Sequence, residues 1–73
     1  GMTPEAFKAA RKSLGLSQAQ AADMLGYGSK PRVSEIERGL INPGASVVRL
    51  LQAYLDGYRP HDWPVVETNR MAS

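Results

Sequence analysis

The side chains of this sequence that could do chemistry are hydrogen-bond donors and cations rather than catalytic groups. The only histidine, His61, lies beside Asp62 in a proline-bounded segment, and the chain contains no cysteine. A catalytic pair or a zinc site needs a second histidine or a thiolate. No glycine-rich phosphate loop or nucleophile elbow is present either. We therefore expect no enzyme, no catalytic residue, no metal and no cofactor, and we expect His61 to lie on the surface.

Positive charge is concentrated in the middle of the chain. The whole chain carries a net charge of +2, but the stretch from Lys8 to Arg49 holds seven basic and three acidic residues, a balance of +4. This asymmetry favours an anionic partner, because neutralisation of phosphates dominates nucleic-acid affinity. Solvated cations that only keep a small domain soluble are the alternative explanation of the same pattern.

Size and composition indicate which classes of protein this chain could belong to. Seventy-three residues suffice for one small domain, and the 42% hydrophobic and 22% charged content is typical of a globular one. No apolar run approaches the ~20 residues of a membrane span. The absence of cysteine fits a reducing compartment. We therefore expect a cytoplasmic protein with no membrane partner.

The cationic and polar residues must be positioned by helices, and the first of these begins after Leu16. Ser17 is followed three residues later by Gln20, which is the pattern of a capping box. Helix-forming residues continue to Gly26, which can adopt the left-handed conformation that ends a helix. The pattern predicts a helix of about two turns.

A second short helix is expected after a turn at Tyr27 and Gly28. Ser29 can cap it, and Pro31 falls in its first turn, where a missing N–H costs little. The helix should end at Gly39. Its apolar residues share one face, so that a mixed polar surface faces outward.

Two further helices flank this pair. The first should run from Pro4 to Leu14, with Thr3 as its N-cap. Residues 40–44 form a loop, and the last helix should reach Asp56. We expect that helix to have a broad apolar face, made of Val47, Val48, Leu50, Leu51, Tyr54 and Leu55. The sequence thus predicts a compact all-α domain of four to five helices in residues 1–58.

Residues 59–73 form a tail in which prolines interrupt regular structure. Two interpretations stay open. The tail could be a strap that packs Trp63 on the domain, because isolated large apolar residues find local cover. It could instead form a dimer contact through Trp63, Val65 and Val66, with strand pairing of the two valines.

The helix pair carries a family resemblance. The pattern LSQxxxAxxLG, a turn, and VSxIERG resembles the Xre/Cro-type helix-turn-helix of phage and bacterial repressors, and the likeness covers residues 3–58. The turn from Gly26 to Val33 is about one residue longer than the commonest spacing of the family. The sequence therefore leaves the first residue of the second helix of the pair open.

The resemblance implies a repressor-like domain that binds specific sequences of double-stranded DNA in the major groove through the second helix of the pair. It also implies a transcriptional regulator, and family analogy favours repression over activation. The first residues of this helix, and one on its next turn, approach bases in the family. These positions correspond here to Ser29, Lys30, Pro31, Arg32, Ser34 and Glu35.

Other residues would contact the DNA backbone or hold that helix in place. Gln18, Arg38 and Asn42 are the candidates for phosphate contacts, although Gln18 could merely favour helix and Asn42 could merely shape the turn. An outward acid at Glu37 would repel DNA, so it should have a partner. The resemblance suggests Arg11, which would make a structural ion pair.

The expected partners are DNA and a second copy of the chain, because one such helix contacts only a few base pairs. The competing hypothesis is a protein-binding module of the same fold, either an antitoxin or an adaptor, that grips another protein with the last helix and the tail. A third is architectural binding without sequence preference. Salt dependence and sequence preference would separate the three.

Overall fold

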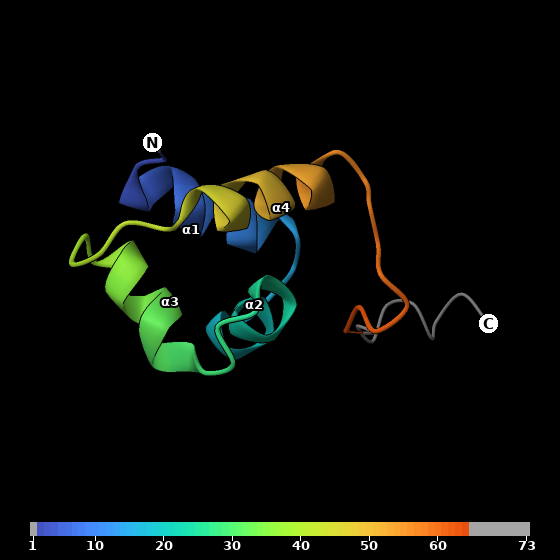
Figure 1. Cartoon of the computed structure of the whole chain (residues 1–73), viewed down its shortest axis with the longest axis horizontal. Helices are drawn as coiled ribbons and strands as arrows, with labels where there is room; N and C mark the ends of the chain where they lie inside the picture. Colours follow the sequence, from blue (N-terminus) through green and yellow to red (C-terminus); the bar gives the residue numbers. More distant parts are fainter. Residues whose placement is uncertain (1, 65–73) are drawn as a thin grey trace.

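Four helices make up the computed structural model of the protein, which describes residues 2–64. They are α1 (Pro4–Ser13), α2 (Gln18–Leu25), α3 (Lys30–Glu37) and α4 (Ala45–Leu55). Helices α1 and α4 run along one side of the molecule, and α2 and α3 lie across from them (Figure 1). Residues 2–64 contain no strand. The prediction of an all-α fold is confirmed.

Short-range hydrogen bonds fix the beginnings of α1 and α2. The Thr3 hydroxyl accepts from the backbone N–H of Ala6 at 3.0 Å. The capping box of α2 is complete, since Ser17 Oγ accepts from the Gln20 N–H at 3.1 Å and Gln20 Oε1 accepts from the Ser17 N–H at 2.9 Å. These contacts satisfy backbone donors that would otherwise lack a partner in the first turn.

The long turn between α2 and α3 depends on two glycines. Gly26 has φ of 86° and Gly28 has φ of 82°, a left-handed conformation that residues with a side chain rarely adopt. Between them the chain folds back on α2, and the N–H groups of Tyr27 and Gly28 both donate to the carbonyl of Ala22, at 2.8 and 3.2 Å. The first part of the turn therefore stays hydrogen-bonded to α2.

Helix α3 begins at Lys30, with Ser29 as its N-cap. The expectation that the Ser29 side chain caps the helix is wrong, since it makes no capping hydrogen bond. The two working caps, Thr3 and Ser17, have φ of −74° and −73°, and each accepts from the N–H of the third helical residue. Ser29 has φ of −152°, so its side chain leaves a more extended backbone and does not bond to the third N–H, that of Arg32. Pro31 at the second position offers no alternative donor, because proline has no N–H.

The core lies where α2 packs on α3 and α1 packs on α3. All four helices contribute buried apolar side chains, and Leu16 fills the space after α1. The largest fully buried side chains are Phe7, Val33, Ile36 and Leu51.

The apolar face of α4 is narrower than the sequence predicts. Leu51 and Tyr54 are buried, whereas Leu55 is 38% exposed. The buried side of α4 faces α2, and the Tyr54 hydroxyl donates to the Met24 carbonyl at 2.7 Å. Leu55, which the predicted apolar face includes, therefore does not belong to the core. It is the last residue of α4 and sits at the edge of the contact with the other helices.

The segment after α4 folds back as a strap on Tyr54. The Trp63 ring meets the Tyr54 ring edge-on, with 4.9 Å between centroids. The Arg59 guanidinium lies 4.3 Å from the centroid of Trp63 and donates to the Tyr54 carbonyl at 2.8 Å. Trp63 thus packs on the domain, as one of the two interpretations expected. The dimer contact that involves Val65 and Val66 falls outside the described residues.

Candidate nucleic-acid interface

Helix α3 presents an exposed polar surface next to a buried apolar one. Val33 and Ile36 are 0% and 1% exposed and anchor the helix to the core. The first turn points away from the core and is exposed, and the next turn is half-buried. The structure places the six predicted base-contact residues on this outer side: Ser29, Lys30, Pro31 and Arg32 in the exposed first turn, and Ser34 and Glu35 in the half-buried second turn.

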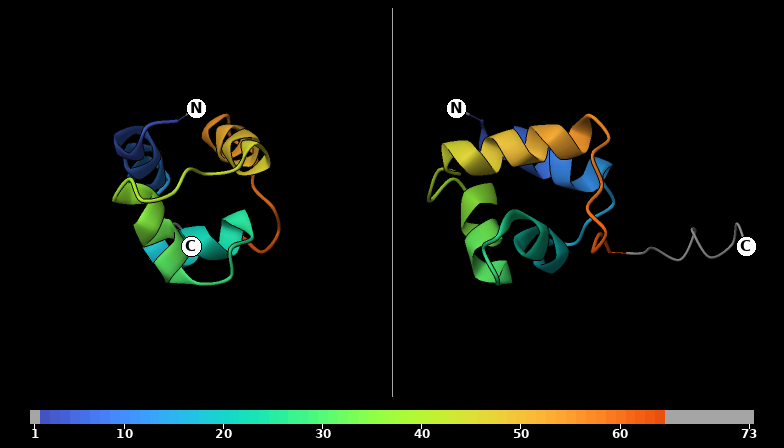
Figure 2. Two further views of the ribbon diagram at one scale, coloured as in Figure 1. Left: turned by 60° about the vertical axis from the view of Figure 1, so that its left-hand side comes forward. Right: turned by 45° about the vertical axis from the view of Figure 1, so that its right-hand side comes forward.

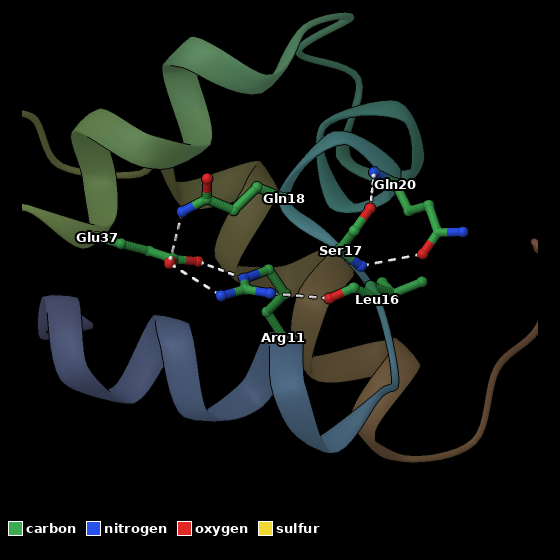
Figure 3. Close-up of polar contacts among 6 residues, drawn as sticks. All are labelled: Arg11, Leu16, Ser17, Gln18, Gln20 and Glu37. Carbon is green, nitrogen blue, oxygen red and sulfur yellow. Dashed lines mark hydrogen bonds and ion pairs between the residues drawn. The ribbon is translucent and has the colours of Figure 1, made fainter.

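The far end of α3 is held by Glu37. Arg11 of α1 donates from Nε to Glu37 Oε2 at 2.6 Å and from Nη2 to Oε1 at 3.2 Å, a bidentate ion pair (Figure 3). The two side chains are 11% and 4% exposed. The structure thus brings together the two residues that the family resemblance paired.

Gln18 makes a contact that the sequence analysis missed. Its Nε2 donates to Glu37 Oε1 at 3.0 Å, so Glu37 contacts both α1 and the start of α2 (Figure 3). Arg11 also donates from Nη1 to the carbonyl of Leu16 at 2.9 Å. We call Arg11, Gln18 and Glu37 the Glu37 triad. No local pattern predicts the Gln18 contact, since the two residues are 19 positions apart.

The charges around Glu37 keep it ionised. Burial of the carboxylate acts to raise its pKa, but hydrogen bonds from Arg11 and Gln18 and the positive charges of Arg11 and Lys8 outweigh that effect. The pKa of Glu37 therefore lies below its ordinary value of 4.5. A negative charge close to the outer surface of α3 is thus directed inward and neutralised by Arg11.

The three predicted phosphate-contact residues lie at different places around α3. Gln18 is the first residue of α2. The capping box occupies the N–H groups of Ser17 and Gln20, so the N–H groups of Gln18 and Ala19 stand at the start of α2 outside that box. Arg38 and Asn42 are exposed and follow the C-terminal end of α3, away from its first turn.

Residues 2–64 contain no group of three or more His, Asp or Glu side chains that could hold a metal ion. Over the same residues, every helix is too short or too polar to cross a membrane. His61 is exposed.

Comparison with known proteins gives one match. A family model described as helix-turn-helix, of the Xre/Cro-like kind, matches residues 7–63, from the buried Phe7 of α1 to Trp63 of the strap. No curated protein and no solved structure matches the chain.

The ion pair predicts energetic coupling between Arg11 and Glu37. Each of Arg11→Ala and Glu37→Ala should lower the free energy of unfolding, because each leaves a charge buried without its partner. The double variant should lose less free energy of unfolding than the two single variants lose together, and urea denaturation should give a coupling energy of about 1–3 kcal/mol. Lys12→Ala provides the control, since Lys12 is exposed and should combine additively with Glu37→Ala. Additive losses for Arg11 and Glu37 would contradict the coupling.

The lowered pKa of Glu37 predicts a pH dependence of stability. The group stabilises the fold above its unfolded pKa of 4.5, and this contribution is lost as the pH falls through the lower pKa of the folded state. Urea denaturation of wild type and Glu37→Gln should therefore show a stability difference at pH 7 that narrows below about pH 4.5. In an Arg11→Ala background this narrowing should shrink. A difference that stays constant or widens in acid would refute the assignment.

Proposed function

The chain belongs to the Xre/Cro-like helix-turn-helix family, whose members bind DNA as transcription regulators, and we propose that it is a cytoplasmic repressor that places α3 in the major groove of specific DNA sequences. The observation that supports this proposal most is the exposed polar first turn of α3, held at a fixed angle by buried Val33 and Ile36 and by the Glu37 triad. The major groove is about 12 Å wide and admits one such helix.

The side chains of α3 differ in the base edges that they can contact. Lys30 and Arg32 donate to guanine O6 and N7, whereas Glu35 accepts from cytosine N4. Pro31 offers an apolar contact to a thymine methyl group, and the hydroxyls of Ser29 and Ser34 bond to either kind of base edge. Of these residues, Lys30 and Arg32 are the ones that are both positively charged and exposed, and they contribute most to discrimination between bases.

Phosphate contacts then orient the helix on the duplex. At the start of α2 the contact comes from the N–H groups of Gln18 and Ala19, which lie outside the capping box, and the Gln18 amide has a second N–H besides the one donated to Glu37. Arg38 and Asn42 bind the backbone beyond the other end of α3. These contacts set the register and affinity of the protein on DNA and carry no sequence information.

Two copies of the chain bind as a homodimer, with one α3 helix in each half-site about one turn of DNA apart. Blocking access to a promoter is the simplest consequence of such binding, which is why we propose repression. An antitoxin or adaptor role is the second candidate. It is favoured by the exposed apolar side chains outside α3, since Leu40 is 62% exposed and Tyr58 is 55% exposed.

The proposal predicts a salt-dependent affinity for duplex DNA that depends on Arg38. A duplex recovered by selection from random sequences should bind ever more weakly as salt rises from about 50 to 200 mM. Arg38→Ala should reduce the slope of log K against log salt by about one. Lys12→Ala removes an exposed cation of α1; it is the matched control and should leave the slope unchanged. Fluorescence anisotropy measures all three proteins.

Failure to bind any duplex, even at about 50 mM salt, would overturn the DNA-binding proposal and leave the antitoxin or adaptor role. Equal affinity for selected and scrambled duplexes, with the salt slope intact, would instead show architectural binding without sequence preference.

A further inference from the structure

The loop that joins α3 to α4 contains Leu40, which is 62% exposed and is the most exposed of the large hydrophobic side chains in residues 2–64. The side chains two positions before and after it, Arg38 and Asn42, are polar and exposed. The loop forms an outer edge of the molecule beyond the C-terminal end of α3 (Figures 1 and 2). Leu40 is therefore a single large apolar side chain within a polar surface.

Hydrogen bonds to the last turn of α3 fix the position of Leu40. The chain turns back at Gly39, which has φ of 82° and whose N–H donates to the Ile36 carbonyl at 3.0 Å. The Leu40 N–H then donates to the Glu35 carbonyl at 2.9 Å. These two bonds form a Schellman motif, a common end of helices. Because the backbone of Leu40 is held before any partner binds, a contact made by its side chain costs less entropy.

This motif does not account for the exposure of Leu40. The residue at its position in a Schellman motif commonly packs on an apolar side chain in the last turn of the helix, three or four residues before the end. The residues at those two positions are Glu35 and Ser34, and both are polar. The Leu40 side chain therefore stands beside Glu35 without an apolar partner at these positions. Glu35 belongs to the side of α3 that carries the base contacts of the proposed function.

We propose that Leu40 packs on a deoxyribose of the DNA backbone, between two phosphates that Arg38 and Asn42 bind. A DNA strand alternates charged phosphates with largely apolar sugars. The loop offers a matching order at every second residue: a cation, an apolar side chain and an amide. The inference rests on the proposed function and adds one contact to it. Since the sugar is uncharged and common to all nucleotides, the contact adds affinity without salt dependence or sequence preference.

A protein partner suits this surface less well. Stable protein–protein interfaces bury about 1,200–2,000 Å² in total, with an apolar core. Around Leu40 the exposed residues are Arg38, Gly39 and Asn42, and Ile41 is half-buried against the domain's own core. One leucine is too small to form the core of such an interface. A single deoxyribose needs no larger apolar partner.

Two substitutions of Leu40 test the contact, by fluorescence anisotropy on a duplex that carries one half-site of the selected sequence. Leu40→Ala should weaken binding about fivefold at every salt concentration, because it removes apolar contact and no charge. Leu40→Lys should steepen the slope of log K against log salt by about one, because it places a cation between two phosphates. Gln52→Lys adds the same charge at an exposed position of α4 and should leave the slope unchanged.

The outcomes separate the Leu40 contact from DNA binding itself. Urea denaturation should give wild type and Leu40→Ala the same free energy of unfolding, since the side chain is exposed. Wild-type affinity and slope in both Leu40 variants would overturn the contact and favour a protein partner for Leu40. A loss restricted to duplexes with one particular base pair would overturn it in favour of a base edge. If wild type bound no duplex at all, the DNA-binding proposal would fall, and the Leu40 contact with it.

Discussion

The arrangement of the helices around α3 depends on the hydrogen bonds that the Glu37 carboxylate accepts. It accepts two hydrogen bonds from Arg11 of α1 and one from Gln18 of α2, at 2.6, 3.2 and 3.0 Å. A buried carboxylate is costly without partners, so these contacts can be satisfied only when three helices meet in one geometry. Burial of Val33 and Ile36 holds α3 against the core, but apolar contacts are not directional. The hydrogen bonds of the Glu37 triad are directional, and they fix the orientation of α3.

This constraint explains how so small a domain can present a defined polar surface. An eight-residue helix is not stable alone, and its orientation comes from its neighbours. Glu37 fixes the C-terminal end of α3, and the first turn at the other end exposes Lys30 and Arg32 to solvent. The same triad turns an acid inward, where Arg11 neutralises it. Less negative charge therefore remains beside Lys30 and Arg32 on the outer side of α3.

Local signals made much of the fold predictable, and long-range contacts made the rest unpredictable. Thr3 and the Ser17–Gln20 box define helix starts because each acts within four residues. The hydroxyl of Ser29 does not act as a cap, because the backbone of Ser29 is more extended than that of Thr3 or Ser17 and Pro31 offers no alternative donor. The bond from Gln18 to Glu37 and the cover that Arg59 gives Trp63 depend on how segments meet in space. The pairing of Arg11 with Glu37 came from family resemblance, since 26 positions separate them.

The central claim is that α3, oriented by the Glu37 triad, is the surface that meets DNA. Backbone amide shifts in an NMR titration of the labelled protein with its selected duplex test this most directly. The account predicts large changes at residues 29–35, at Gln18 and Ala19, and at Arg38 and Asn42, with the amides of Phe7 and Leu51 nearly unchanged. Changes confined to α4 and Tyr58, with α3 unaffected, would contradict it.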